Sequence, residues 1–161
     1  MGMEYIKINS TVGELTLGAS SKGLVAVLWQ HEKENRVKVD LGINNSNNKY
    51  LQKAKAQLQE YFAGKRIEFD LELDPVGTEF QINVWKNLQQ IPYGQTASYK
   101  DLAVMIGNAK ASRAIGMANG KNPLSIIVPC HRVIGANGEL TGYAGGLENK
   151  KKLLQLENLS N

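Results

Sequence analysis

The stretch Ile126-Ile127-Val128-Pro129-Cys130-His131-Arg132-Val133 places the only cysteine of the chain between a proline and a histidine, directly after a short apolar run. Pro129 fixes its own φ angle and has no backbone N–H, so it can end a buried strand and hold the next residue at a defined exit angle. A thiol is a useful nucleophile as thiolate, and a neighbouring imidazole or cation lowers its pKa from about 8.5. The stretch therefore indicates a reactive Cys130, although a lone cysteine is more often a small buried hydrophobe.

Length and composition limit the class of protein. The 161 residues suffice for one ordinary domain or two small ones. Residues 1–10 lack the pattern of a secretory signal, and no segment approaches the roughly 20 apolar residues that span a bilayer. We therefore expect a cytoplasmic protein with no membrane partner. One cysteine excludes an internal disulfide, and with two histidines it cannot supply the usual zinc ligands, so no metal is expected.

The charge of the chain is unevenly distributed. Residues 1–76 hold ten Lys/Arg and ten Asp/Glu, whereas residues 77–161 hold nine and five, so the net charge of +4 belongs to the second part. Such asymmetry is typical of a module that faces nucleic acid. A solvated basic face without a partner gives the same pattern, and charge alone does not decide between the two.

The first part of the chain predicts strands followed by a helix. The expected strands are short β-prone runs separated by glycines, at residues 5–8, 14–17 and 24–29. After an Asn/Ser-rich loop at 44–48, apolar residues recur at helical spacing from Leu51 to Phe62, and Gly64 is placed to end that helix. The alternation from Ile67 to Leu73 predicts a half-buried strand. Asp74-Pro75 breaks this pattern, and we place a domain boundary there, between residues 1–76 and 77–161.

The second part predicts mostly helix. Thr78 and Gln81 form a capping box for a helix whose apolar face consists of Phe80, Val84, Leu88 and Ile91. Ser98 and Asp101 can cap a second helix that runs to Ile106, and residues 110–119 predict a third. This order is helix-turn-helix in outline. Small residues surround Arg113 in the third helix, which offers few side chains that read bases in a major groove, so a minor-groove approach with one inserted side chain suits it better. Close packing against another helix is the alternative.

Taken together, these segments resemble the O6-alkylguanine-DNA alkyltransferases, also called methylated-DNA-protein-cysteine methyltransferases. The resemblance runs from about residue 77 to 157, and its motifs are Asn122-Pro123, residues 129–133 and Gly142-Tyr143-Ala144-Gly145-Gly146-Leu147. It implies an α/β protein with an N-terminal ribonuclease-H-like α/β domain (1–76) and a C-terminal, mostly helical, winged-helix-like domain with a helix-turn-helix (77–161).

The resemblance also implies a function. Cys130 would accept the alkyl group from O6-alkylguanine irreversibly, one group per molecule and without a cofactor; O4-alkylthymine is left open as a second substrate. His131 would take the thiol proton through a water, and Glu157 would orient the imidazole. Tyr99 would donate to the departing base, and Asn122 would brace the helix-turn-helix against the active-site loop. By position alone, Glu157 could equally be a solvated residue at a helix end, Tyr99 a core residue and Asn122 a turn residue.

The same resemblance assigns the contacts with DNA. The expected partner is double-stranded DNA with an alkylated guanine, which a monomer would bind through the minor groove and flip into a pocket. The expected DNA-binding residues are Ala111, Ser112, Arg113, Asn119 and Arg132. The expected wall of the base pocket is formed by Val133, Tyr143, Ala144 and Gly145, where glycine permits close backbone approach.

Two other classes of protein fit parts of the sequence. A DNA-binding regulator or lesion sensor would share the helix-turn-helix, but its cysteine would be inert or would only signal alkylation. A Cys-His hydrolase would share the Cys130-His131 pair, but it would turn over many times. The number of alkyl groups removed per protein molecule separates these classes from a stoichiometric acceptor.

Overall fold

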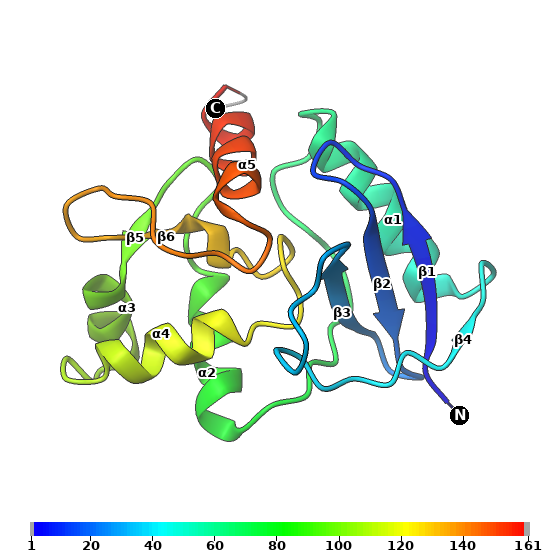
Figure 1. Cartoon of the computed structure of the whole chain (residues 1–161), viewed down its shortest axis with the longest axis horizontal. Helices are drawn as coiled ribbons and strands as arrows, with labels where there is room; N and C mark the ends of the chain where they lie inside the picture. Colours follow the sequence, from blue (N-terminus) through cyan, green and yellow to red (C-terminus); the bar gives the residue numbers. More distant parts are fainter. Residues whose placement is uncertain (1, 160–161) are drawn as a thin grey trace.

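The protein is described by a computed structural model that covers residues 2–159. Two bodies lie side by side in Figure 1: a sheet with one helix on the N-terminal side, and a mostly helical body on the other. Residues 74–78, between the two, are in neither helix nor strand. The exact division after residue 76 stays a prediction. No helix within residues 2–159 has both the length and the apolar character needed to cross a membrane.

The N-terminal sheet has four strands in the order β3-β2-β1-β4, namely β1 (Glu4–Ile8), β2 (Leu15–Ala19), β3 (Leu24–Trp29) and β4 (Ile43–Asn44). The first three form the expected antiparallel meander, and the short β4 pairs with β1 in parallel. The three predicted strands are therefore confirmed. The sequence did not predict β4, because two exposed residues carry no alternation that could reveal a strand.

Helix α1 (Lys49–Phe62) covers one face of this sheet. Asn48 caps it by accepting hydrogen bonds from the backbone N–H groups of residues 50 and 51. Leu51, Ala54 and Leu58 are fully buried in the same core as the inward side chains of β2. Gly64 follows the helix with φ 74°, a left-handed conformation that glycine adopts without strain. The predicted helix and its end are thus confirmed.

The strand predicted from Ile67 to Leu73 is wrong. Residues 67–68 form a bend, only Leu73 makes a bridge, to Leu24, and Ile67 is 57% exposed. The physical reason lies in α1, where the buried side chain of Gln57 donates to the carbonyl of Asp70 at 3.0 Å and accepts from its N–H at 2.9 Å. Because a side chain already satisfies that backbone, the segment needs no strand partner there.

The second body begins with three helices, α2 (Glu79–Leu88), α3 (Tyr99–Ile106) and α4 (Ser112–Gly120). Both predicted capping boxes are present, at Thr78 with Gln81 and at Ser98 with Asp101. Phe80 was expected on the apolar face of α2, but it is 38% exposed and Trp85 is buried instead. The reason is that the fully buried residues of α2 begin at Val84 and the first core contact of the helix is the partly buried Ile82, so the first turn projects beyond the core.

A two-stranded parallel sheet and two further helices complete this body: β5 (Ala97–Ser98), β6 (Val133–Ile134), the 3₁₀ turn η1 (Cys130–Arg132) and α5 (Leu147–Leu159). The sheet beside the helix-turn-helix agrees with the winged-helix-like expectation. The two bodies are joined through β3, where the N–H of Val27 donates to the carbonyl of Pro123 at 2.8 Å. The segment that precedes Cys130 therefore continues the hydrogen bonding of the N-terminal sheet.

Candidate active site

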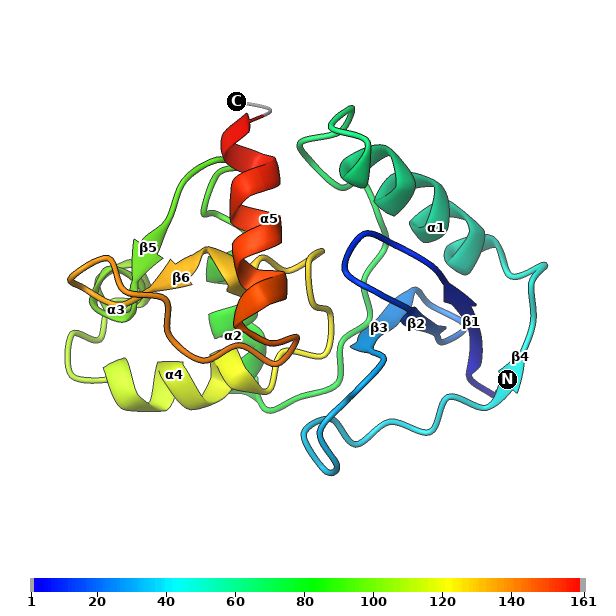
Figure 2. The same ribbon diagram turned by 45° about the horizontal axis from the view of Figure 1, so that its top comes forward.

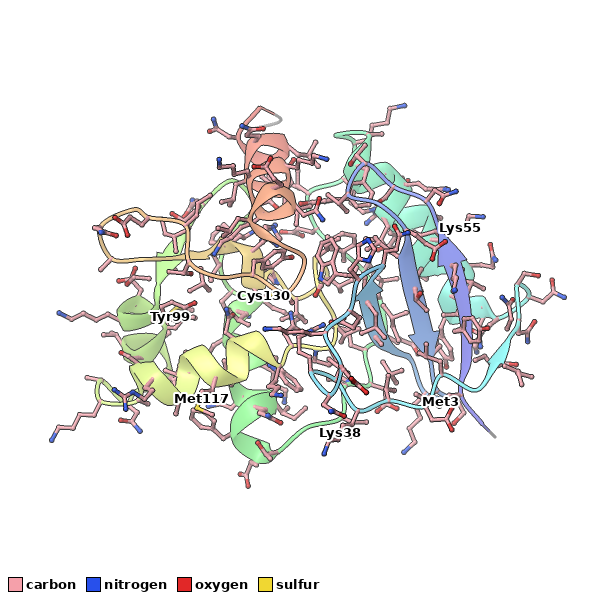
Figure 3. The ribbon with its side chains drawn as sticks, viewed as in Figure 1. Met3, Lys38, Lys55, Tyr99, Met117 and Cys130 are labelled. Atoms are coloured by element: carbon pink, nitrogen blue, oxygen red, sulfur yellow. The ribbon has the colours of Figure 1, made fainter. Side chains whose placement is uncertain are left out.

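Cys130 lies at the end of a wholly buried segment, residues 122–130, between the two bodies (Figure 3). The segment turns sharply at Ile126, whose φ of 75° is left-handed and rare for a β-branched residue. Hydrogen bonds from Ile127 N to Ser125 O and from Val128 N to Leu124 O hold this turn. Backbone strain of this kind persists only where the surroundings enforce it, and it is frequent at functional sites. The turn delivers Cys130, which is 4% exposed, to the first position of η1.

Asn122 holds both the segment and the sulfur. Its buried Nδ2 donates to the carbonyl of Val128 at 2.9 Å and to Cys130 Sγ at 3.2 Å, and its Oδ1 accepts from Leu124 N at 3.0 Å. The sequence predicted an asparagine that braces the loop through backbone hydrogen bonds. It did not predict the direct contact with the sulfur, which a linear pattern cannot reveal.

His131 and Glu157 form a buried pair, although 26 positions separate them. His131 Nε2 lies 2.6 Å from Glu157 Oε2, and burial lowers the pKa of His131 despite this carboxylate. A neutral imidazole with Nε2–H directed at a carboxylate leaves Nδ1 as the proton acceptor. Nδ1 is buried and has no hydrogen-bond partner among residues 2–159. The pair therefore has one oriented nitrogen and one free basic nitrogen.

The structure contradicts the expectation that Arg132 contacts DNA. This residue is 6% exposed, and its Nε donates to Glu157 Oε1 at 2.7 Å. Its Nη2 donates to Glu157 Oε2 at 3.1 Å, and its Nη1 to the carbonyl of Ile91 at 2.7 Å. The guanidinium turns inward because a buried carboxylate needs a charged partner and α5 brings Glu157 to it. Arg132 thus supports the carboxylate that orients His131.

Tyr61 is a residue of this site that the sequence did not single out for function. Its hydroxyl comes from α1 in the other body and donates to Glu157 Oε2 at 2.6 Å. Burial and the charge of Glu157 raise the pKa of Tyr61, so it stays a donor. The only sequence signal is a tyrosine within the apolar stripe of α1, where a leucine would fill the core equally well. Burial alone would raise the pKa of Glu157, but the hydrogen bonds from His131 and Arg132 outweigh it and lower the pKa to about 2.

The expectation that a neighbouring imidazole lowers the pKa of Cys130 is also corrected. Burial raises the pKa of the Cys130 thiol, while the Asn122 hydrogen bond and the charges of Arg36 and Lys150 oppose this effect. The reason is that His131 directs Nε2 to Glu157 and the thiol has left water. In this conformation the thiol is therefore the stable form at neutral pH.

The expected base-pocket residues meet around the loop 134–146. The Tyr99 hydroxyl lies 3.2 Å from Thr141 Oγ1, and Lys150 Nζ donates to the carbonyls of Val133 at 2.6 Å and Thr141 at 3.2 Å. Tyr143 is half-buried, and its hydroxyl has no hydrogen-bond partner in the described part of the chain. The structure thus brings Tyr99, Val133 and the loop together through Thr141 and Lys150, which the sequence reasoning did not name.

Helix α4 carries the residues that were expected to face DNA, and it lies at the edge of the second body in Figure 2. Arg113 is exposed, whereas Ala111 and Ser112 are half-buried. Asn119 does not face outward. It is buried with Ile115 and Ala118, because positions i, i+3 and i+4 share the helix face that packs into the core. Met117 is instead an exposed side chain of α4, and Figure 3 shows it beneath the helix.

The fold and the site define a two-domain α/β protein in which a helix-turn-helix body carries a buried cysteine beside a histidine–glutamate pair. Residues 3–75 match the family described as 6-O-methylguanine DNA methyltransferase, ribonuclease-like domain, and residues 79–159 match its DNA binding domain. The chain belongs to this family.

Individual relatives resemble the chain over nearly its whole length. The methylated-DNA–protein-cysteine methyltransferase of Methanosarcina acetivorans is 48% identical over 155 residues, which are 96% of this chain and 98% of that protein. The crystal structure of Mycobacterium tuberculosis OGT in complex with DNA has a TM-score of 0.84 at 46% identity, and the match covers 98% of this chain and 94% of the OGT chain. The O6-methylguanine methyltransferase structure from the same organism has a TM-score of 0.86 at 46% identity, and the match covers 99% of this chain and 94% of the other.

Proposed function

We propose that this protein repairs DNA by moving the alkyl group from O6 of a flipped-out guanine to Sγ of Cys130. The observation that carries the proposal is the position of the only cysteine. It is buried after the strained turn at Ile126, receives a hydrogen bond from Asn122, and is followed directly by a histidine that a carboxylate orients. Family membership supplies the kind of substrate, and the relatives named above carry that activity in their names.

The transfer is a displacement at the alkyl carbon. The thiol proton passes through a bridging water to His131 Nδ1, which makes no direct hydrogen bond to the sulfur, and Glu157 stabilises the resulting imidazolium. The sulfur then forms a C–S bond while the C–O6 bond breaks and its electron pair leaves with guanine. A hydroxyl donor at the base ring, the role proposed for Tyr99, stabilises the developing negative charge. The product is a thioether, which is not readily cleaved, so each molecule reacts once.

Base flipping must be accompanied by a movement of the protein. Because Cys130 is only 4% exposed, a flipped-out base cannot reach its sulfur from outside the protein. The loop 134–146 therefore has to move aside when the nucleotide enters. The exposed Arg113 on α4 is the side chain proposed to fill the vacated stack from the minor groove. The small side chains around it permit close approach of the helix to the groove. The monomeric state and the cytoplasmic location stay predictions.

Intact-mass measurement tests the proposal. After incubation with duplex DNA that contains O6-methylguanine, we expect the protein to gain the mass of one methyl group, located by peptide mapping on Cys130. Cys130→Ala should bind the same duplex and gain nothing. A protein that remains unmodified, that carries the methyl group elsewhere, or that removes more than one group per molecule would overturn the proposal.

A further inference from the structure

Trp29 ends β3 in the N-terminal body and is buried at its contact with the second body. Its Nε1 donates to Ser125 Oγ at 3.1 Å, inside the segment that leads to Cys130. The neighbouring hydrogen bond from Val27 N to Pro123 O fixes the same segment, so β3 holds it at two points. The indole is thereby anchored to the active-site segment.

The ring of Trp29 also contacts the loop that should receive the base. Its centroid lies 5.5 Å from that of Tyr143 at an interplanar angle of 74°, an edge-to-face pair. Gly145 packs its backbone directly on the indole. A Cβ added there would lie 2.5 Å from Cζ2 and 2.7 Å from Cδ2 of Trp29, closer than real side chains come. Glycine is therefore required at residue 145 while the indole is in place.

These contacts reach two segments that the proposed reaction has to bring together. One segment carries the nucleophile Cys130, and the other carries Tyr143 and Gly145 beside the base. No other aromatic side chain among residues 2–159 forms a ring pair with Tyr143. Lys150 Nζ lies 6.0 Å from the centroid of the Tyr143 ring, and burial together with the nearby Cys130 side chain raises the pKa of Tyr143. The Trp29 ring is thus one of three groups that surround this tyrosine, and the only one of the three that comes from the N-terminal body.

We propose that Trp29 is a positioning residue for alkyl transfer, which gives the N-terminal domain a direct part in shaping the base pocket. The indole holds the Tyr143–Gly145 wall at a fixed distance from the Cys130 segment, and this distance sets the alkyl groups that fit. The inference rests on the proposed function. It requires no contact between Trp29 and the reacting atoms, so its effect is on the orientation of the base and not on binding of DNA.

The kinetic test compares Trp29→Phe with Trp85→Phe. Trp85 is the other tryptophan of the chain; it is equally buried and donates Nε1 to the carbonyl of Ala118, away from the loop. Single-turnover rates at saturating duplex, with O6-methylguanine and with O6-benzylguanine, separate transfer from binding. For Trp29→Phe we expect the limiting rate of transfer from O6-methylguanine to fall about tenfold or more. The ratio of the limiting rates with O6-methylguanine and O6-benzylguanine should also change, whereas the DNA concentration that gives half the limiting rate should change little. Trp85→Phe should keep that ratio.

A double-mutant cycle tests the contact itself. Gly145→Ala should slow transfer strongly in the natural background, because its methyl group meets the indole. In a Trp29→Ala background the same substitution should cost several-fold less, because alanine lacks the whole indole ring that this Cβ would meet. Purely additive effects would overturn the inference, as would equal limiting rates for Trp29→Phe and Trp85→Phe.

Fluorescence gives a readout that does not depend on transfer. In a Cys130→Ala/Trp85→Phe variant, Trp29 is the only tryptophan, so its emission should change with a lesion duplex and much less with an undamaged one. Identical emission with both duplexes would contradict a role beside the base. If the protein with its natural sequence is never alkylated at Cys130, the proposed function fails. If Cys130 is alkylated, but substitution of Trp29 does not change the transfer rate and the Trp29 emission does not respond to the lesion, only the present inference fails.

Discussion

Tyr61→Phe removes one hydroxyl that lies far from Cys130 in sequence and reaches Glu157 from the other body. The bond is 2.6 Å long, buried and directed at an ionised carboxylate, which is the geometry of a charge-assisted hydrogen bond. Phenylalanine keeps the ring in the core. We therefore expect the loss to come from this hydrogen bond alone.

The magnitude follows from the partners that remain. A hydrogen bond to a charged group contributes about 1.5–3 kcal/mol to stability. In a domain of this size, a loss of that amount lowers the melting temperature by about 3–12 °C. Glu157 keeps its contacts with His131 and Arg132, so it stays ionised at pH 7 and transfer should slow by less than about tenfold. The pKa of Glu157 should rise, because one donor to its charged form is lost.

Urea unfolding measures the stability, and Tyr50→Phe is the matched control. Tyr50 lies on the same helix, but its hydroxyl donates to the carbonyl of Ser21 at the surface, at 3.3 Å. The control should change the free energy of unfolding by less than about 0.5 kcal/mol. If Tyr61→Phe is no less stable than Tyr50→Phe, the reasoning about the buried carboxylate is refuted.

Three further outcomes follow from the same site and from α4. Arg132→Met should cost about 3–5 kcal/mol in urea unfolding, because it leaves Glu157 buried without its permanently charged partner. The same variant should leave the salt dependence of DNA binding unchanged; a changed salt slope together with normal stability would restore Arg132 to the DNA surface. The free energy of unfolding should fall in acid, because folding lowers the pKa values of both His131 and Glu157. Their contributions to stability are complete above the ordinary pKa values of 6.5 and 4.5, and they are lost as the pH falls through the lowered pKa values of the folded state. For Glu157 the loss amounts to about 3 kcal/mol between pH 4.5 and about 2, and unfolding that becomes harder in acid would contradict this assignment. Arg113→Ala should slow repair of duplex DNA and reduce the salt dependence of DNA binding. Its melting temperature should stay within about 2 °C of that of the natural protein, since Arg113 is exposed. An unchanged repair rate would exclude the proposal that Arg113 inserts into the base stack.

The elements with strong local signals could be predicted from the sequence. Capping boxes at Thr78 and Ser98, the helical stripe from Leu51 to Phe62 and the glycine that ends it each depend on neighbours within one or two turns. The segment 67–73 failed because its alternation suits a strand, while the decisive contact comes from Gln57 on another element. Propensity has no information about such a partner.

The sequence by itself determined the family and singled out Cys130 as the candidate nucleophile, because adjacent residues such as Pro129, Cys130 and His131 are close in any fold. Only the tertiary structure decided what surrounds them. It turned Arg132 inward, joined Tyr61 to Glu157, raised the pKa of the thiol and set Trp29 against the base loop. The physical reason is that burial, charge pairing and ring contacts depend on distances between segments up to 116 positions apart, and these distances exist only after the two bodies have packed together.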